Sequence, residues 1–169
     1  MHCFFDTIIV ATCTGSTQAG MVVGFAAQDR LRRIIGIDTA NNAAMMRNAV
    51  EKISYETAQL IASKGGKKIQ IAPDAIDIKT NYSAPAYGLP SQQTIDAIRT
   101  AAELEAMITD PVYEGKSMAG LIDLCQKKEF SKNSKILYVH LGGVPAIHAY
   151  YQAFADLQPV GLIQSSHQG

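Results

Sequence analysis

The sequence has no excess of charge of one sign, because 15 Lys and Arg residues balance 15 Asp and Glu residues in a chain of 169. Without a basic excess the chain has little with which to neutralise nucleic-acid phosphates or an anionic lipid surface, so both kinds of partner are disfavoured. It also has no apolar run that approaches the roughly 18–20 residues of a membrane span. Its first ten residues lack the cationic stretch that begins a signal peptide.

Cysteine is scarce as well, with three residues at Cys3, Cys13 and Cys125. Their number is odd, their spacing is wide and no CxxC or Cys/His pattern occurs, which argues against a disulfide framework and a structural zinc site. We therefore expect no metal and a reducing, cytoplasmic compartment. With 47% apolar and 18% charged residues the composition is that of a globular protein. We expect one domain, residues 1–157, and a flexible tail, residues 158–169.

Segments typical of buried strands alternate with segments of helical periodicity. The strand-like segments span residues 7–10, 33–38 and 135–140. The helix-like segments span residues 18–27, 43–63, 92–105 and 117–127, and a final helix begins near Pro145. Residues 69–78 contain a proline and fit either a loop or an edge strand. Strands joined by helices predict parallel pairing with right-handed crossovers, hence an α/β fold of three layers, an αβα sandwich with a mostly parallel sheet.

Two of these helices have clear end signals. Asn41 or Asn42 can cap the helix at 43–63, and Ser91 can cap the helix at 92–105. The apolar face of the helix at 43–63 is expected to consist of Met46, Val50, Ile53, Ala58, Leu60 and Ile61.

The most informative segment runs from Thr7 to Gly20, where a buried strand enters the tight turn Thr14-Gly15-Ser16-Thr17 and then a helix. Such a turn directs backbone N–H groups and hydroxyls to one spot at the positive end of a helix dipole, which favours binding of a phosphate. A second glycine turn, Gly142-Gly143, follows the strand at 135–140. Because ligands in such sheets bind beyond the carboxyl ends of the strands, we expect both turns to form one site.

The glycine spacing can be compared with two well-known phosphate motifs. Gly15 and Gly20 have the separation of the P-loop glycines, but Met21 stands where that motif needs a lysine, so nucleoside triphosphate hydrolysis is excluded. Asp38 lies about 20 residues beyond the glycine turn, where a dinucleotide fold places its ribose-binding acid. The three-glycine pattern is missing, however, and an acid at a strand end is commonly solvated or a helix cap. A nucleotide-cofactor oxidoreductase domain stays as an alternative to a site for a single terminal phosphate.

Four ordered motifs point to a known family: residues 14–21, 87–90, 110–118 and 140–145, which read TGSTQAGM, YGLP, DPVYEGKSM and HLGGVP. Together they resemble 1-aminocyclopropane-1-carboxylate (ACC) deaminase, a fold-type II pyridoxal-phosphate enzyme of the tryptophan synthase β-like superfamily. The resemblance runs from Phe5 to Phe154 and covers the C-terminal half of such an enzyme. It implies that the chain is the larger, phosphate-binding part of that fold, truncated at the N-terminus.

The resemblance implies that the chain binds pyridoxal 5′-phosphate. The residues it assigns to the cofactor phosphate agree with the turn described above: Cys13 (through its backbone N–H), Thr14, Gly15, Ser16 and Thr17. In the family, the cofactor forms a Schiff base with a lysine in the N-terminal half, beside a Ser-Asn-Gln segment that holds the substrate carboxylate. Neither is expected here, because only residues 1–6 precede the first strand.

The remaining site residues are also implied by the resemblance. Glu114 would face the pyridine nitrogen, where an anion keeps that nitrogen protonated and the ring a strong electron sink. Leu141 and Gly142 would lie beside the cofactor. Tyr87, Tyr113 and Glu114 would be the catalytic residues, with the two phenols near the substrate, where they can hydrogen-bond or pass a proton.

Without the family motifs, simpler interpretations apply. Glu114 would be an exposed acid near a helix start, and the two tyrosines would be partly buried core residues. Lys116 does not match the covalent lysine of the family and is interpreted as a surface lysine in the first turn of a helix. His140 could face the cofactor, but a hydrogen-bonded structural role is expected. Asp110 and Pro111 resemble a turn that positions Tyr113.

The implied reaction opens the cyclopropane ring of ACC and releases 2-oxobutanoate and ammonia, the chemistry of a hydrolase that acts on C–N bonds. Glu114 with Leu141 resembles the deaminase subgroup, since the related D-cysteine desulfhydrases often place hydroxyl residues at these positions; a D-cysteine desulfhydrase stays as an alternative. Without the covalent lysine we expect the chain to be inactive alone, and the intact enzyme to be a homo-oligomer. A non-catalytic phosphate-ligand or subunit-interaction domain is a further alternative.

Overall fold

The computed structural model describes residues 4–30, 33–40 and 42–155. The expected domain end at residue 157, the tail at 158–169, Cys3 and the candidate cap Asn41 lie outside the described residues. The elements follow in the order β1 (Thr7–Thr12), α1 (Ser16–Ala27), β2 (Arg33–Asp38), α2 (Ala43–Ser63), η1 (Pro73–Ala75), β3 (Asp77–Lys79), α3 (Gln92–Glu105), α4 (Glu114–Gln126), β4 (Ile136–Val139) and η2 (Val144–Phe154).

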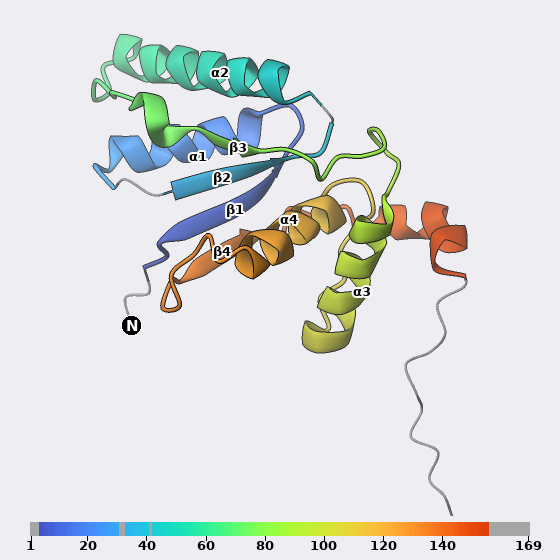
Figure 1. Cartoon of the computed structure of the whole chain (residues 1–169). Coiled ribbons are helices and arrows are strands. Elements are labelled where there is room, and N and C mark those ends of the chain that lie inside the picture. The colour runs from blue at the N-terminus through green and yellow to red at the C-terminus, as the bar shows by residue number, and fades with distance from the viewer. Residues whose placement is uncertain (1–3, 31–32, 41, 156–169) are drawn as a thin grey trace, which may run out of the picture.

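The strands form one parallel sheet in the order β3-β2-β1-β4. Thr7 is in register with Arg33 of β2 on one side and with Ile136 of β4 on the other. Helices α1 and α2 cover one face of the sheet, and α4, with α3 packed against it, covers the other (Figure 1). The three-layer α/β fold with a parallel sheet is therefore confirmed.

The core follows from the alternation of side chains along strands that are buried on both faces. Ile8 and Val10 of β1 point to one face, where they pack with Val22 of α1. Ile9, between them, points to the other face and packs in the cluster that contains Leu124 of α4. β1 is thus enclosed by both helical layers, which fixes the position of the turn that follows it.

The predicted caps are present at both helices that carried end signals. The side chain of Asn42 accepts a hydrogen bond from Met45 N–H at the start of α2, and Ser91 Oγ accepts one from Thr94 N–H at the start of α3. On the expected apolar face of α2, Leu60 is a misassignment, because 58% of its surface is exposed.

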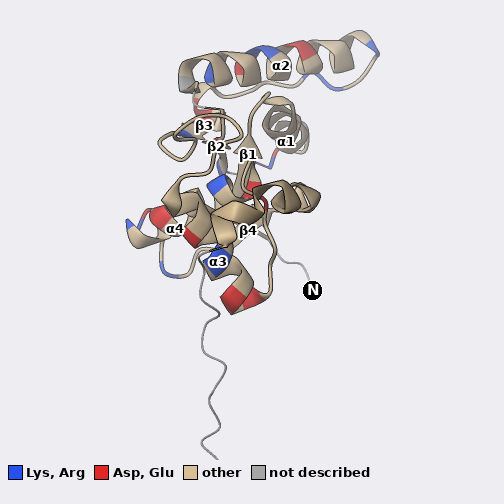
Figure 2. Cartoon of the chain, turned by 90° about the vertical axis from the view of Figure 1, so that its right-hand side faces the viewer, with Lys and Arg blue, Asp and Glu red and all other residues tan. Residues whose placement is uncertain are grey.

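Charges of both signs alternate along α2 (Figure 2). Arg47 pairs with Glu51 and Lys52 with Glu56, each one turn apart on the helix surface. The charged residues of this helix are thus paired with neighbours of opposite sign.

The C-terminal part differs from the expectation in helix type. Residues 144–154 form a 3₁₀ helix, η2, with Pro145 in its first turn, and the helical backbone is interrupted at Tyr150 (φ −112°, ψ 20°). In the segment that fitted a loop or an edge strand, Pro73 begins the short helix η1, and β3 follows it as the edge of the sheet.

Candidate active site

A cavity of about 340 Å³ opens at the carboxyl end of β1. Three segments line it: the end of β1 with the turn into α1, the start of α4, and the loop after β4. The lining residues are Ala11, Thr12, Cys13, Thr14, Gly15, Thr17, Gln18, Tyr113, Glu114, Leu141, Gly142 and Gly143. The two glycine turns, which are far apart in the sequence, therefore meet in one cavity, as the parallel topology predicts.

The turn at residues 14–17 has the geometry of an anion cradle. Gly15 has φ +85°, and a β-carbon there would lie 2.9 Å from Val50 Cγ2, so the position requires glycine. The first N–H groups of α1 have no acceptor within the helix and are available to a bound anion. Thr14 and Thr17 line the cavity, whereas Ser16 is exposed at the helix start and is not among the lining residues.

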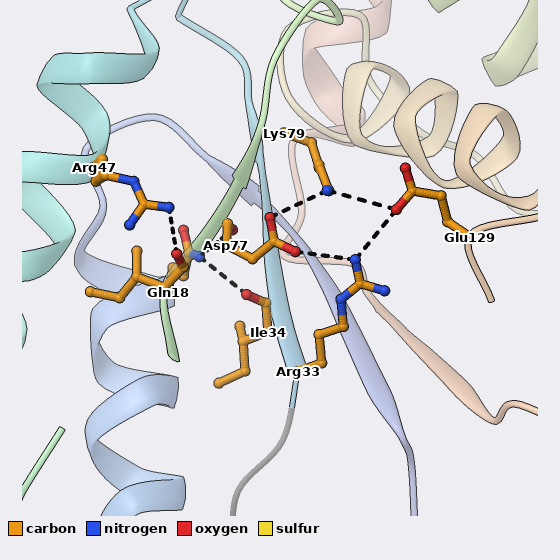
Figure 3. A network of polar contacts seen from close by, with 8 residues as sticks. Gln18, Arg33, Ile34, Arg47, Asp77, Lys79 and Glu129 are labelled. Carbon is orange, nitrogen blue, oxygen red and sulfur yellow. Dashed lines mark hydrogen bonds and ion pairs between the residues drawn. The ribbon is translucent and has the colours of Figure 1, made fainter. Parts of the chain in front are cut away.

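Beneath this turn, Gln18 ties α1 to the sheet (Figure 3). The side chain is fully buried; its Nε2 donates to Asp77 O at 3.0 Å and to Ile34 O at 3.4 Å, while Oε1 accepts from Thr12 Oγ1 at 3.0 Å. A β-carbon on Gly36 would lie only 2.1 Å from Gln18 Oε1. The glutamine thus occupies space that β2 leaves free, and it fixes the start of α1 against β1 and β3.

An ion-pair cluster that includes the side chain of Asp77 holds β3 in place (Figure 3). Arg33 and Lys79 each pair with both Asp77 and Glu129, at distances of 3.3–3.7 Å. Glu129 follows α4 in the chain, so the cluster connects the edge strand to the opposite helical layer.

Asp38, the candidate ribose-binding acid, is fully buried. Its Oδ1 accepts from Ala40 N–H at 2.8 Å and its Oδ2 from Asn42 N–H at 2.9 Å. The carboxylate caps the turn before α2. This arrangement removes the residue on which the dinucleotide alternative depended.

The start of α4 is set by Asp110, which is also fully buried. Its Oδ1 accepts from the N–H groups of Val112 (2.8 Å) and Tyr113 (2.9 Å), and its Oδ2 accepts from Glu114 N–H at 2.9 Å. These bonds satisfy N–H groups that a helix start leaves free. They begin α4 at Glu114 instead of the predicted Ser117, and they confirm that the turn at Asp110 positions Tyr113.

Glu114 is not an exposed acid, since only 1% of its surface is accessible. One oxygen, Oε1, accepts from Leu141 N–H at 3.1 Å, and the other, Oε2, accepts from Tyr138 Oη at 3.0 Å. Burial raises the pKa of this carboxyl above its ordinary value, and the two hydrogen bonds oppose the rise. The carboxyl is therefore held rigidly at the cavity wall, in an environment that favours taking up a proton.

Tyr113 and Tyr87 meet through their hydroxyls, which hydrogen-bond to each other. Their rings pack edge to face, with centroids 5.9 Å apart and planes at 63°. The hydrogen bond to Tyr87, helped by burial, raises the pKa of Tyr113 to about 12. Tyr113 lines the cavity, whereas Tyr87 is 54% exposed and lies outside the lining, so the interpretation of Tyr87 as a core residue is wrong.

The interpretation of Lys116 as a surface lysine is also wrong. The residue is fully buried, and its Nζ donates to Ala86 O at 2.8 Å, to Ser83 O at 2.9 Å and to Thr39 O at 3.4 Å. Burial lowers the pKa of the ammonium, and the carboxylate of Asp38 opposes that shift. The helix starts at Glu114, earlier than expected, and Lys116 in its first turn faces the carbonyls of residues 39, 83 and 86 instead of solvent.

The loop after β4 closes the site. His140 Nε2 donates to Ile108 O at 2.8 Å while Nδ1 accepts from Gly142 N–H at 3.3 Å, which fits a neutral imidazole with its proton on Nε2. The hydrogen-bonded structural role expected for His140 is confirmed. These bonds hold Leu141 where its backbone N–H reaches Glu114.

Tyr138 is the functional candidate that sequence reasoning missed. Its one O–H is shared between two acceptors of the same residue, Glu114 O at 2.7 Å and Glu114 Oε2 at 3.0 Å, and its oxygen lies 2.9 Å from Ser117 Oγ. Burial and the nearby Glu114 raise the pKa of this phenol. An aromatic residue inside a buried strand gives no local signal of such a role.

In the described ranges, no group of three or more His, Cys, Asp or Glu side chains could hold a metal ion. Over the same residues, no helix is both long and apolar enough to cross a bilayer.

Residues 2–142 match the model of a family described as pyridoxal-phosphate dependent enzyme. Over 152 residues the chain is 56% identical to a 1-aminocyclopropane-1-carboxylate deaminase of Rhizobium radiobacter and 55% identical to one of Bradyrhizobium diazoefficiens. Each match covers 90% of this chain and 44% of the relative. The chain thus spans less than half the length of these curated relatives.

The fold comparison agrees. A crystal structure described as an ACC deaminase homologue superposes with a TM-score of 0.80 at 30% sequence identity, covering 94% of this chain and 46% of that one. The resemblance to ACC deaminases is confirmed. The chain belongs to the family of pyridoxal-phosphate-dependent enzymes.

Proposed function

We propose that this chain supplies the phosphate-binding and ring-binding part of a pyridoxal-phosphate site for the deamination of ACC. The observation that carries the proposal is that the turn at residues 14–17 and the carboxyl of Glu114 border the same cavity. One is suited to an anion and the other to a ring nitrogen, the two polar ends of the cofactor.

The phosphate end is the turn before α1. The backbone N–H groups from Cys13 to Thr17, that of Ser16 included, and the hydroxyls of Thr14 and Thr17, which line the cavity, would hold the phosphate at the positive end of the helix dipole. Gly15 supports this fit, since its φ of +85° lets the chain turn sharply without a side chain in the way. Gln18 keeps the cradle fixed to the sheet through its buried hydrogen bonds.

The ring end is Glu114, with Leu141 and Gly142 beside the ring. When bound, pyridoxal phosphate supplies an electron sink for the bond that breaks in the substrate. The carboxyl of Glu114, whose pKa burial raises, would accept a hydrogen bond from the protonated pyridine nitrogen and would hold the proton at that end of the ring. Tyr138 and the N–H of Leu141 orient the carboxyl and keep it from rotating away.

The substrate end is the tyrosine pair. Tyr113 lines the cavity, and its hydroxyl hydrogen-bonds to that of Tyr87, which lies outside the lining. The pair can hold a substrate polar group or pass a proton along the two hydroxyls. With its pKa raised above the ordinary value of tyrosine, Tyr113 is a neutral phenol at physiological pH and can donate a hydrogen bond.

No lysine is among the cavity-lining residues of the described chain. The lysine that bonds the cofactor aldehyde must therefore come from elsewhere, and we propose that the chain alone releases no product. In the complete enzyme, we propose a cytoplasmic homo-oligomer that hydrolyses ACC to 2-oxobutanoate and ammonia. The pair of Glu114 and Leu141 supports deamination over the desulfhydration of D-cysteine.

The test is complementation. The purified chain is mixed with pyridoxal phosphate and the part of the Rhizobium radiobacter relative that lies outside the matched segment, and products are followed by mass spectrometry. The expected result is 2-oxobutanoate from ACC in the mixture and none from the chain alone. Tyr113→Phe should reduce the rate, whereas Thr100→Val, an exposed change on α3, should not.

Other outcomes contradict parts of the proposal. Release of 2-oxobutanoate by the chain alone would contradict the proposal that the chain is inactive by itself. Pyruvate and sulfide from D-cysteine, with nothing from ACC, would assign the desulfhydrase activity instead. No product together with no cofactor binding would favour a non-catalytic interaction domain.

A further inference from the structure

Lys116 is the one cation among the buried residues of the described chain. Its three hydrogen-bond partners are backbone carbonyls: Thr39 O directly after β2, and Ser83 O and Ala86 O in the segment between β3 and α3. An ammonium removed from water costs free energy unless all its donors are satisfied. Three carbonyl oxygens match its three N–H donors.

The segment that supplies two of these carbonyls also carries Tyr87. Residues 80–91 form neither a regular helix nor a strand, but Leu89 N–H donates to Ala86 O at 3.1 Å and closes a turn around Tyr87. This turn fixes Tyr87 relative to Ala86, so the position of Tyr87 in the fold depends on the contacts that hold the turn. Besides the Lys116 ammonium, the segment is anchored by Tyr82 Oη, which donates to Asp123 Oδ2, and by Gly88 O, which accepts from Tyr150 Oη; both distances are 2.6 Å. Lys116 lies between these two anchors and bonds the residue that directly precedes Tyr87.

The first turn of α4 therefore controls both tyrosines. Tyr113 caps the helix and Glu114 begins it, and both line the cavity. Lys116, two residues later, extends to the opposite side and bonds the Tyr87 segment. Any shift of this turn moves Tyr113 and the anchor of Tyr87 together, so their hydroxyls stay in register.

We infer that Lys116 is a positioning residue: by binding the carbonyls of Ser83 and Ala86, it holds Tyr87 so that its hydroxyl meets that of Tyr113. The inference rests on the proposed function in one respect: the proposed function is what gives this tyrosine pair a role in contacting the substrate. The geometry itself requires neither cofactor nor substrate, so it can be tested on the chain as it is.

The first measurement uses the unmodified chain with ¹⁵N-labelled lysine and ring-protonated tyrosine. A slowly exchanging ammonium signal is expected for Lys116, with nuclear Overhauser contacts to Ser83 and Ala86. Contacts between the ring protons of Tyr87 and Tyr113 are expected as well. A Lys116 ammonium that exchanges as fast as those of the surface lysines would overturn the inference without any variant.

The second measurement replaces the donor. Lys116→Met keeps most of the side-chain length but donates nothing, and Lys116→Gln keeps two donors on a shorter side chain. We expect loss of the Tyr87–Tyr113 contacts in the methionine variant and partial retention in the glutamine variant. Lys52→Met, which removes an exposed lysine paired with Glu56 on α2, should leave the contacts unchanged.

A general loss of structure is distinguished by the response of Tyr113. If Lys116 acts through Tyr87, the ring signals of Tyr113 in Lys116→Met should move to their positions in Tyr87→Ala, which removes both the ring and the hydroxyl of Tyr87, and combining the two substitutions should add no further shift. Additive shifts, or unchanged Tyr87–Tyr113 contacts in a folded Lys116→Met, would overturn the inference. A chain that does not bind the cofactor would contradict the proposed function, but it would leave the ring signals of Tyr87 and Tyr113 unchanged.

Discussion

Gly143 lies against the carboxylate of Asp110, so closely that a β-carbon on residue 143 would be 2.5 Å from Oδ2. The same carboxylate accepts the N–H groups that start α4. The loop after β4 and the first turn of α4 are thereby packed together, and the cavity lies between them and the turn after β1.

Gly143→Ala is expected to destabilise the fold. The methyl group would displace the Asp110 carboxylate, and φ of +83° is itself unfavourable for alanine, so the cost should be about 1–3 kcal/mol. Urea unfolding measures it. Gly20→Ala is the matched control, because nothing lies within 4 Å of its β-carbon and the site is inside α1, where alanine is the better helix former. Equal stability of the Gly143 variant and the unmodified chain would contradict the contact.

Gln18 and Gly36 should be energetically coupled. Gly36→Ala alone forces a β-carbon against Gln18 Oε1, and Gln18→Ala alone leaves buried partners such as Asp77 O without their donor, at a cost of about 1–3 kcal/mol. In the double variant the clash with Gln18 is gone and only Thr12 Oγ1, 2.6 Å from the new β-carbon, remains, so the free energy of unfolding should fall by less than the sum of the two single losses. Strict additivity in a double-mutant cycle would show that the two residues do not compete for one space.

Glu114→Gln should change how stability depends on pH. Burial raises the pKa of Glu114, so the folded chain favours the protonated carboxyl, and this contribution is complete below the ordinary glutamate pKa. It is lost as the pH rises through the raised value. The glutamine variant cannot ionise, so it should match the unmodified chain in acid and exceed its thermal midpoint at neutral pH.

The control for that comparison is Glu103→Gln, which removes an exposed carboxylate paired with Arg99 on α3. It should show no gain at neutral pH. A Glu114→Gln variant that is less stable than the unmodified chain at neutral pH would contradict the stated environment of the carboxyl.

Tyr87→Phe should lower the pKa of Tyr113 from about 12 toward the ordinary value of tyrosine, since the hydrogen bond between the two hydroxyls is the main cause of the rise. Alkaline titration of ¹³C-labelled tyrosine, with the Tyr113 ring carbon as the reporter, measures it. Tyr151→Phe removes an exposed phenol elsewhere and should leave the titration of Tyr113 unchanged.

Features encoded by a few neighbouring residues could be predicted from the sequence. The buried runs gave β1 and β2, and Asn42 and Ser91 marked the starts of α2 and α3. The turn at residues 14–17 could be recognised because strand, glycine and hydroxyl residues follow one another directly.

Features that depend on residues distant in the sequence could not be predicted. Lys116 has the local pattern of a surface lysine, and only the carbonyls of the segment before α3 make its burial favourable. Helical periodicity correctly predicted that Met46, Val50 and Ala58 of α2 are buried, but it does not show how far the buried face extends around the helix. Leu60 was therefore predicted to be buried although it is exposed. The role of Tyr138 depends on Glu114, which lies 24 residues earlier in the chain.

The most direct measurement is the affinity of the chain for pyridoxine 5′-phosphate, determined by isothermal titration calorimetry beside pyridoxine itself. This ligand has the ring and the phosphate of the cofactor but no aldehyde, so it cannot react with lysines. We predict that pyridoxine 5′-phosphate binds and that pyridoxine binds far more weakly. Glu114→Gln should lower the affinity for pyridoxine 5′-phosphate, whereas Thr100→Val should leave it unchanged. Equal binding of both ligands, or binding of neither, would contradict it.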